Sequence, residues 1–427
     1  MGRTCVAGVM LLAAILAPGC GGGGGGSGGG GGTPVAAVLQ SIVVSPGTVT
    51  LDTHGKAALT CLGQYSNGSQ QALSATWSIS DPAVASLDGA AGTTAMLTGV
   101  DEGDAVVTAQ AAGMTAQADV SVVDMLPADP GPVYGGSETD IVQYPASGGG
   151  PPTVIYTPPS YVGMGFTPNR AATVLYTMGW NDTGDAENIY SYDTRTGASA
   201  LVVSIPTSPY DRPFGLDYDA QGRLYTTCYG TGALLRITPA TGAIEALGTA
   251  PAYSNFDLAV GRDDMPYYAP MGGPTWITRH DYAAGPPTAW AEYPPSFVTD
   301  YPDFVIPCGL AINRRGEAFT TDVNSSVLYV NRDLNGDGDA LDAGEATAFA
   351  DMGGAYGDYF IYGVSAAKGN SVLLNVTPWG SATSALGVHW LRDLNGDGDA
   401  LDPGESTLYN ATYTPANIDG SCVGARR

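Results

Sequence analysis

Two acidic segments, 60 residues apart, carry the side chains best suited to chemistry in this sequence. Both read RDLNGDGDALD, at 332–342 and 392–402, and both continue to a Gly-Glu pair. Five carboxylates within 13 residues repel one another, and a hard divalent cation that takes six to eight oxygen ligands relieves that repulsion. The spacing therefore predicts structural calcium at both segments. The oxygen-bearing side chains stand at relative positions 1, 3, 5, 7, 10 and 13, namely Asp333, Asn335, Asp337, Asp339, Asp342 and Glu345, then Asp393, Asn395, Asp397, Asp399, Asp402 and Glu405.

A glycine at relative position 6 lets each segment bend sharply, so that its two sides converge. With that glycine, the pattern resembles the D-x-[DN]-x-[DN]-G calcium loops of EF-hands, dockerins and integrin-type propellers. It departs from an EF-hand at position 12, where Gly344 and Gly404 replace the bidentate Glu, and the flanking sequence predicts strands rather than helices. The alternative is an acidic turn held by Asx hydrogen bonds without metal, copied when a structural unit was duplicated.

Familiar catalytic motifs are missing from the sequence. It contains no H-E-x-x-H, C-x-x-C, G-x-S-x-G or Walker pattern. Its three histidines, His54, His280 and His389, are isolated, and we expect them in solvent or in hydrogen-bonded packing. Aromatic residues suited to recognition of sugars or proteins occur in the predicted loops, although we expect at least half of them to pack in the core; they are Trp180, Trp276, Trp290, Trp379 and residues 293–304.

Charge excludes one class of partner. The 427 residues carry a formal net charge of −25 and only two lysines, Lys56 and Lys368. Binding to a phosphate backbone requires several basic contacts, so we expect no nucleic-acid partner. The 44% hydrophobic content is enough for a sizeable core.

The first 37 residues predict export and anchoring. Residues 1–19 contain a 13-residue apolar run, Cys5 to Ala17, which is too short to span a bilayer as a helix and is typical of a signal peptide. The run ends in Leu-Ala-Pro-Gly-Cys and resembles a bacterial lipobox, which implies lipidation of Cys20 and residence at the outer membrane or cell surface. Ordinary cleavage near Ala17 is the alternative. Residues 20–37 begin with a glycine run that predicts a flexible tether.

Residues 38–124 predict a small β-sandwich. Alternating segments such as Thr76–Ile79 and Ala105–Ala109 are separated by turns at near-regular spacing. The stretch resembles the bacterial Ig-like group 2 (BIG2) domains through Ile42, Val44, Pro46, Leu51, Gly55, Leu59, Trp77, Asp81, Val84, Ala85, Leu97, Thr98, Gly99, Gly103, Ala105 and Val107. The resemblance implies a spacer or adhesive module with Trp77 in its core.

Residues 125–138 are rich in Pro and Gly and predict a linker, and residues 139–427 then repeat. Related strand-turn-strand units open at Gly163, Gly215, Asp257, Gly309 and Gly363, with spacings of 52, 42, 52 and 54 residues. These spacings match β-propeller blades and resemble the NHL, YncE-like and SMP-30-like propellers. Five full blades plus a sixth shared by both chain ends predict a six-bladed ring, with a five-bladed ring as the alternative.

Removal of the signal peptide and lipidation of Cys20 leave Cys61, Cys228, Cys308 and Cys422, whose pairing the sequence does not decide. For Cys61, which lies in a different predicted domain from the other three, a buried free thiol is at least as good an interpretation as a disulfide. Together these features predict an all-β, lipid-anchored cell-envelope protein that binds or scaffolds glycans or surface proteins. The alternative function is a secreted propeller hydrolase or lyase that acts on a polysaccharide or lactone.

Overall fold

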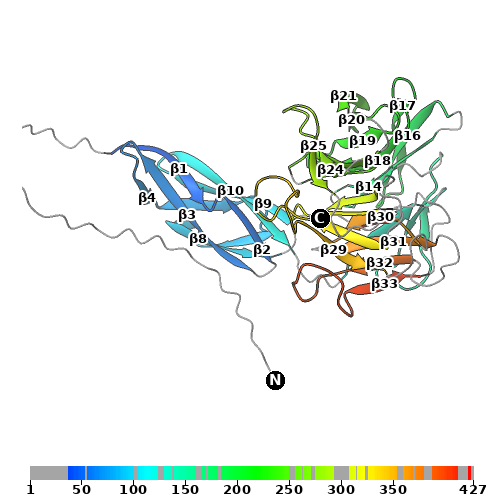
Figure 1. Cartoon of the computed structure of the whole chain (residues 1–427). Coiled ribbons are helices and arrows are strands. Elements are labelled where there is room, and N and C mark those ends of the chain that lie inside the picture. The colour runs from blue at the N-terminus through cyan, green and yellow to red at the C-terminus, as the bar shows by residue number, and fades with distance from the viewer. Residues whose placement is uncertain are drawn as a thin grey trace, which may run out of the picture.

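The computed structural model describes residues 37–424, with gaps at 53–54, 101–102, 124–128, 137–138, 160–164, 170–171, 181–183, 250–254, 262, 271–274, 293–306, 314, 323–325, 353–358, 369–370, 379–386 and 412–421. Every helix or strand in these residues is a β-strand, and the strands form eight sheets (Figure 1). The predicted all-β class is confirmed. No helix in the described residues is long and apolar enough to cross a membrane. Cys20 and the glycine run lie outside the described residues.

The first two sheets form the predicted β-sandwich. One sheet has the order β1 (Leu39–Ser45), β3 (Lys56–Tyr65), β8 (Thr94–Gly99), β6 (Ala85–Asp88), with β4 (Gln70–Ala72) paired to β3. The other has the order β2 (Thr48–Asp52), β10 (Met114–Val123), β9 (Gly103–Ala111), β5 (Ala75–Ile79), β7 (Ala91–Gly92). Strands β2 and β10 are parallel, and the other pairs in both sheets are antiparallel.

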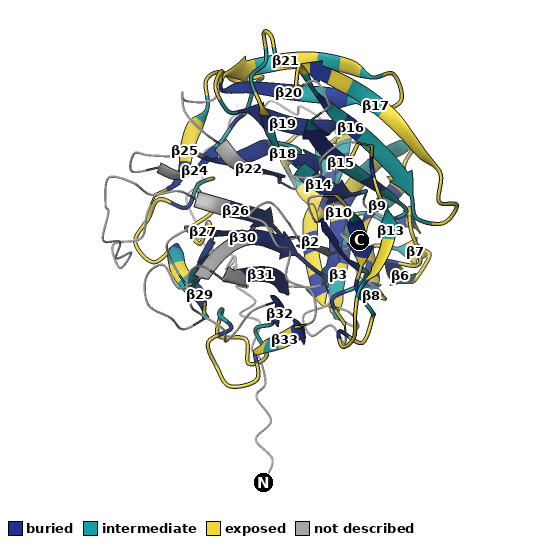
Figure 2. Cartoon of the chain, turned by 90° about the vertical axis from the view of Figure 1, so that its right-hand side faces the viewer, coloured by how far each residue is buried: buried dark blue, intermediate teal, exposed yellow. Residues whose placement is uncertain are grey.

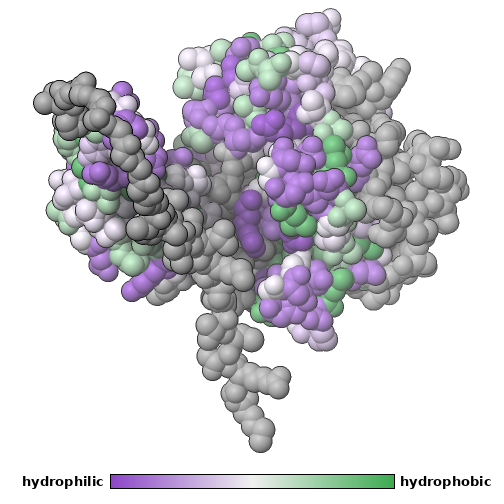
Figure 3. Space-filling view, turned by 60° about the vertical axis from the view of Figure 1, so that its left-hand side comes forward, coloured by the Kyte–Doolittle hydropathy of each residue, from purple (hydrophilic) through white to green (hydrophobic). Residues whose placement is uncertain are grey.

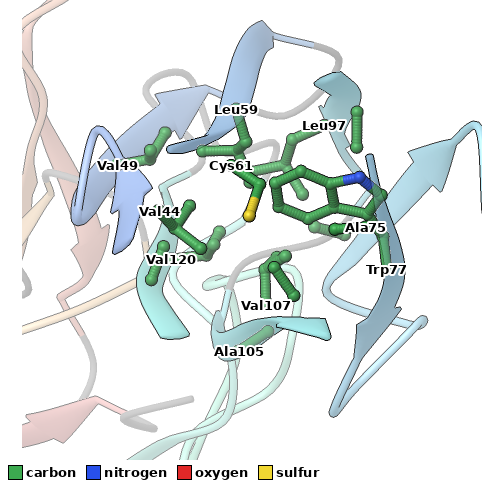
Figure 4. Close-up of a cluster of buried hydrophobic side chains, with 14 of the residues drawn as sticks. Val44, Val49, Leu59, Cys61, Ala75, Trp77, Leu97, Ala105, Val107 and Val120 are labelled. Atoms are coloured by element: carbon green, nitrogen blue, oxygen red, sulfur yellow. The ribbon is translucent and has the colours of Figure 1, made fainter. Parts of the chain in front are cut away.

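Alternation along the strands fills the sandwich core, because successive side chains of a strand face opposite sides of its sheet. The indole of Trp77 is 4% exposed and lies beside the thiol of Cys61 (Figure 4). The indole N–H of Trp77 donates to the carbonyl oxygen of Gly92 at 3.0 Å, so its polar atom has a partner. Cys61 is a buried free cysteine, and burial raises the pKa of its thiol. Trp77 is therefore a core residue.

The other six sheets each contain four antiparallel strands and form the blades of the ring. Blade 1 contains β14 (Gly165–Pro168), β15 (Val174–Trp180), β16 (Ala186–Asp193) and β17 (Ser199–Pro206). Blade 2 contains β18 (Pro213–Tyr218), β19 (Leu224–Cys228), β20 (Ala233–Thr238) and β21 (Ala243–Thr249). Blade 3 contains β22 (Asn255–Val260), β23 (Pro266–Pro270), β24 (Thr275–Arg279) and β25 (Thr288–Glu292). Blade 4 contains β26 (Pro307–Ile312), β27 (Ala318–Asp322), β28 (Val327–Asn331) and β29 (Ala346–Asp351). Blade 5 contains β30 (Tyr359–Ala366), β31 (Val372–Pro378), β32 (Gly387–Leu391) and β33 (Ser406–Asn410).

The closing blade joins both ends of the ring. Its strand order is β13 (Thr153–Tyr156), β12 (Ile141–Gln143), β11 (Val133–Gly136), β34 (Cys422–Gly424), so the C-terminal strand is added to three N-terminal strands. In the antiparallel register Tyr134 lies opposite Val423. The first strands of blades 1 to 5 and β34 contact one another in ring order. The six-bladed prediction is confirmed, and the shared blade removes the open edge that a five-bladed chain would leave.

The predicted linker is partly wrong. Strand β11 lies inside residues 125–138, so the ring begins at Val133 rather than at residue 139. Gly135 of this segment allows close packing, because a Cβ there would come within 2.9 Å of the Tyr144 ring. Composition alone therefore misassigned the strand.

Close backbone approach explains the glycines that open the blades. A Cβ at Gly215 would lie 2.6 Å from the backbone nitrogen of Leu258 in the next blade, and one at Gly165 would lie 2.6 Å from Leu216 Cβ. Gly165 thus has the place in blade 1 that the sequence assigned to Gly163, which lies outside the described residues. Exposure increases outward: β19 is buried along its length, whereas β21 at the rim is mostly exposed (Figure 2).

Removing β34 by deleting residues 422–427 should open the ring, because it exposes the backbone groups of β11. We expect the melting temperature to fall on the order of ten degrees. Deleting six residues of the glycine run, 24–29, is the length-matched control and should leave it unchanged. A truncated protein that melts within about two degrees of the parent would instead indicate five self-contained blades.

Candidate functional site

The two acidic segments form equivalent hairpin loops of neighbouring blades. The first acidic loop (residues 332–345) connects β28 to β29 in blade 4, and the second acidic loop (residues 392–405) connects β32 to β33 in blade 5. Strands flank both loops, as the sequence predicts. Each loop is thus held at both ends by a pair of antiparallel strands.

A buried glutamate closes each loop. Glu345 is 3% exposed, and its carboxylate accepts the backbone N–H groups of Leu334 at 2.9 Å and Asp342 at 3.0 Å. Glu405 is 2% exposed and accepts the corresponding groups of Leu394 at 2.8 Å and Asp402 at 3.1 Å. Because each carboxylate spans the loop, these two predicted metal ligands have a structural role that needs no metal.

The first aspartate of each loop also accepts backbone N–H groups. Asp333 accepts from Gly336 at 2.6 Å and Gly338 at 2.9 Å, and Asp393 accepts from Gly396 and Gly398 at the same distances. Gly338 has a φ of 103° and Gly398 a φ of 100°, which are strained for residues with a Cβ. The glycine at position 6 therefore permits the bend, as predicted.

The remaining predicted ligands meet around an asparagine amide. The Nδ2 of Asn335 donates to Asp337 at 3.0 Å and to Asp342 at 2.6 Å, and Asn395 makes the same pair of bonds to Asp397 and Asp402 at 2.9 and 2.6 Å. Asp339 and Asp399 accept the backbone N–H two residues on. The oxygen donors are the types that calcium prefers. The arrangement described is nevertheless a hydrogen-bonded turn, and within residues 37–424 as described no three His, Cys, Asp or Glu side chains are grouped to hold a metal ion.

Both acidic loops tie their blade to the preceding one. The N–H of Ala340 donates to the carbonyl oxygen of Trp290 at 2.7 Å, and the N–H of Ala400 donates to that of Phe349 at 2.6 Å. The two alanines are 2% and 3% exposed. The loops therefore stabilise the contacts between blades 3, 4 and 5.

Arg332 connects the two loops. Its Nε donates to the Glu317 carboxylate at 2.8 Å, and its Nη2 donates to the carbonyl oxygen of Gly398 at 2.6 Å. Glu317 is 7% exposed, so the ion pair lies in a poorly solvated environment, where it is screened less than a surface pair. The two loops thus share one guanidinium group.

A groove of about 1760 Å³ lies between the sandwich and the ring, and hydrophilic side chains line a hollow there (Figure 3). The sandwich contributes residues of β9 and β10, including Asp104 and Asp119. The ring contributes the turns after β18, β22 and β26 together with both acidic loops. The side chains that line the groove include ten acidic ones and three arginines: Asp104, Asp119, Asp219, Asp263, Asp264, Glu317, Asp333, Asp393, Asp397, Asp399, Arg279, Arg315 and Arg332.

Several groove carboxylates already have strong partners in the chain. Asp263 is paired with Arg279 at 2.8 Å, and Asp219 accepts from Arg223 and from the hydroxyl of Tyr225. On the sandwich side, Asp119 is an exposed residue of β10. The groove therefore combines fixed ion pairs on the ring with the exposed carboxylate of Asp119 opposite them.

The predicted recognition aromatics divide between core and surface. Trp290 is 4% exposed and packs edge-on against Tyr267 with ring centroids 5.3 Å apart, which is the core role expected for part of this set. Trp180 is partly exposed, with the Arg212 guanidinium 5.3 Å from its ring centroid. Trp379 and residues 293–304 lie outside the described residues, and so does the side chain of Trp276.

The remaining reactive side chains have structural surroundings. His280 is 2% exposed, its ring lies edge-on to Tyr268, and burial lowers the pKa of its imidazole. His389 is 6% exposed, and His54 lies outside the described residues. Cys228, like Cys61, is free and buried; the side chains of Cys308 and Cys422 lie outside the described part.

Sequence reasoning missed the groove and one buried acid. The groove depends on two units that the sequence treats separately, and no spacing relates Asp119 to Asp397. A charged residue in a strand of alternating pattern is expected to face solvent. Glu187 in β16 is instead 0% exposed. Glu187 lies two residues before the buried Ile189 and so faces the same side of the sheet. This position was the one sign in the sequence that Glu187 is buried.

No protein-family model matches the chain, and no curated protein matches it significantly. It is similar to the solved structure of selenomethionine-substituted virginiamycin B lyase from Staphylococcus aureus, with 16% identity over 60% of this chain and 75% of that one and a TM-score of 0.40. It is also similar to a structural genomics protein of unknown function from Bacteroides thetaiotaomicron (10% identity, 80% and 96% covered, TM-score 0.41) and to a chain of the nidogen/laminin complex (10%, 69% and 99%, 0.47). At these values the description as a β-propeller rests on the six four-stranded sheets of the chain itself.

Proposed function

We propose that this chain is an exported, lipid-anchored cell-envelope protein that binds a partner in the groove between its sandwich and its propeller. The observation that carries the proposal is the groove itself, a large hollow lined by residues of both the sandwich and the ring. A hollow between units is a usual place for ligand binding. The lipobox-like segment and glycine run before the sandwich would hold that groove close to a membrane surface.

The charge of the groove favours a cationic partner. Ten acidic side chains against three arginines attract positive charge and repel polyanions. A basic segment of a surface protein or an amine-bearing glycan fits this charge. Binding is a better reading than hydrolysis or lysis, because Asp219, Asp263 and Glu317 are already engaged by arginines and are poorly placed to transfer protons.

The anchor belongs to the same proposal. Cys20 would begin the mature chain and carry lipid, and Gly21 follows it where an aspartate would favour the inner membrane by analogy with lipoprotein sorting. We therefore assign the protein to the outer membrane or cell surface. The sandwich, in keeping with its resemblance to BIG2 domains, would act as a spacer between the tether and the ring.

Structural calcium is the second part of the proposal. The two acidic loops keep the same hydrogen-bond partners in different blades and contain ten of the 41 acidic residues of the chain. Their oxygen donors would hold a divalent cation, which offsets the repulsion between carboxylates. Asp337 and Asp397 are exposed side chains of this set and can exchange a hydrogen bond for a metal ligand at small cost.

The first prediction concerns groove charge. Asp119→Lys places a positive charge in the groove, so we expect it to weaken the binding of fluorescent oligolysine on the order of tenfold, as measured by anisotropy at low salt. Asp88→Lys makes the same change in net charge on an exposed strand end outside the groove lining, and it should change affinity by less than about twofold. Equal effects of the two substitutions would show that the groove is not the binding site.

The second prediction concerns the anchor. Mass spectrometry of the mature protein should find an N-terminus at a lipid-modified Cys20, and the protein should partition into detergent. Cys20→Ser should abolish both, because serine lacks the thiol that receives the lipid. Cys61→Ser, which alters a buried thiol of the sandwich, should leave both unchanged. An unmodified N-terminus at another residue would refute the anchor.

The third prediction concerns calcium. A cation that binds only the folded state stabilises it by about 2.7 kcal/mol at a hundredfold excess over its dissociation constant, so millimolar calcium should raise the melting temperature by several degrees. Asp337→Ala and Asp397→Ala should each remove part of that increase, because each removes one carboxylate from one loop. Magnesium should do less, since it keeps its water.

Asp88→Ala is the matched control for calcium, because it removes an exposed carboxylate far from both loops in the chain. It should leave the calcium response intact. Calorimetry without calcium heat, combined with a melting curve that ignores chelator, would leave the loops as acidic turns stabilised by their own hydrogen bonds.

A further inference from the structure

A buried carboxyl group without a described partner lies where blades 1 and 2 meet. Glu187 in β16 is 0% exposed, and neither of its carboxyl oxygens has a hydrogen-bond partner in the described part of the chain. Ile189, two residues along the same strand, faces the same side of the sheet and belongs to the apolar cluster that includes Leu216 and Cys228 of blade 2. Glu187 therefore faces the junction of the two blades.

The neighbours of Glu187 across the sheet are large side chains. Its strand partners are Trp180 in β15 and the fully buried Ile205 in β17. Directly paired residues of neighbouring strands point to the same face, so the carboxyl lies between an indole and an isoleucine. Burying an ionised carboxylate in such surroundings without a partner is costly.

Arg212 is the cation that acts on this carboxyl. It stands just before β18, its guanidinium lies 5.3 Å from the Trp180 ring centroid, and its side chain is 53% exposed. Its φ of 45° is unusual for a residue with a side chain, and its carbonyl oxygen accepts the N–H of Tyr229 at 2.8 Å. The backbone of Arg212 is thus fixed, whereas its exposed side chain is free to change partner.

Two further titratable groups are close to this junction. Asp211 is a half-exposed carboxylate whose nearest contact with Arg212 is 4.0 Å, a weak surface pair. Cys228 lies in β19, and burial, together with the charges of Asp211 and Glu187, raises the pKa of its thiol to about 12. The thiol therefore stays neutral across the range in which a carboxyl group titrates. Asp185, next to β16, is exposed.

We propose that Glu187 is a proton-operated switch at the junction of blades 1 and 2. When the carboxyl loses its proton, the new carboxylate draws the Arg212 side chain off the face of Trp180 into an ion pair. The backbone of Arg212 stays in place, so the change is confined to its exposed side chain and the Trp180 ring. Because Arg212 precedes β18 and the groove lies beyond Tyr218 at the other end of that strand, the switch acts on the face of the ring opposite the groove.

The direction of the pH effect follows from burial. Desolvation raises the pKa of Glu187 to about 8, although the charge of Arg212 opposes the rise. A carboxyl with a pKa of about 8 is mostly protonated in the fold at pH 7, whereas the same group in the unfolded chain is ionised. The stability of the fold therefore decreases as pH rises from the ordinary carboxyl pKa to about 8, and the full cost is present above that value.

The test follows Trp180 directly. Subtracting the fluorescence of the Trp180→Phe protein from that of the parent isolates the Trp180 signal, which is titrated between about pH 6 and pH 9. We expect one transition with a midpoint within about one pH unit of 8. Glu187→Gln, which cannot ionise, should abolish it, whereas Glu292→Gln, which removes an exposed carboxylate of blade 3, should leave it in place.

Arg212→Gln separates ionisation from the movement of the guanidinium. This variant keeps Glu187, so its stability should still fall with pH, with a higher midpoint because the favourable charge is gone, while the Trp180 transition should disappear. If Glu187→Gln fails to fold, Glu187→Met provides the same test with an apolar side chain of similar length. A Trp180 transition that persists in either Glu187 variant or in Arg212→Gln would overturn the proposal.

Discussion

The pairing of β34 with β11 is the contact on which the rest of the structure depends. It joins residues almost 290 positions apart, Tyr134 and Val423, through backbone hydrogen bonds that any residue types could make. Without it, the closing blade would have three strands, and its inner edge would be open. With it, six inner strands contact one another in a closed circle, and each blade has a neighbour on both sides. The two acidic loops and Glu187 all lie at junctions between such neighbours.

Blade junctions therefore combine stability with chemistry. In blades 3 to 5 the junctions are tied by the acidic loops, whose buried alanines donate to the preceding blade and whose shared Arg332 joins one loop to the other. At the junction of blades 1 and 2, Glu187 is buried without such satisfaction. The first arrangement uses polar groups to stabilise a contact. The second leaves a carboxyl group whose charge depends on its proton, and a local change of charge of that kind can bias a two-state element.

Short-range pattern accounts for what could be predicted from the sequence. The blades were recognised because each is built from consecutive strands, so Gly215 and Gly309 open similar units at blade spacing. The sandwich core was recognised through the alternation around Trp77. In contrast, the sequence predicts a linker over residues 125–138 because this segment is rich in Pro and Gly. That composition does not show whether Gly135 bends freely or packs closely, and its contact with the Tyr144 ring decides for packing.

The candidate sites were predicted less completely. The spacing of polar residues identifies side chains that can form hydrogen bonds, but it does not show which groups they bond to. The acidic side chains of the loops were identified, but nothing in their spacing shows that Glu345 accepts two backbone N–H groups or that Asn335 lies between two carboxylates. The groove combines Asp119 and Asp397, which belong to separate units. The burial of Glu187 comes from Trp180 and Ile205 in the neighbouring strands and from blade 2, and only its place among the inward-facing residues of β16 indicates it in the sequence.

Native-state hydrogen exchange tests the closed ring most directly, because it reports the opening of individual strands. If β34 closes the ring, the amides of β11 and β34 should exchange together, at a rate close to that of the buried strand β19, since they open only with the ring. Exchange of β34 within seconds while β19 stays protected would contradict the account. The C-terminal strand would then be an appendage, and the propeller would hold together without it.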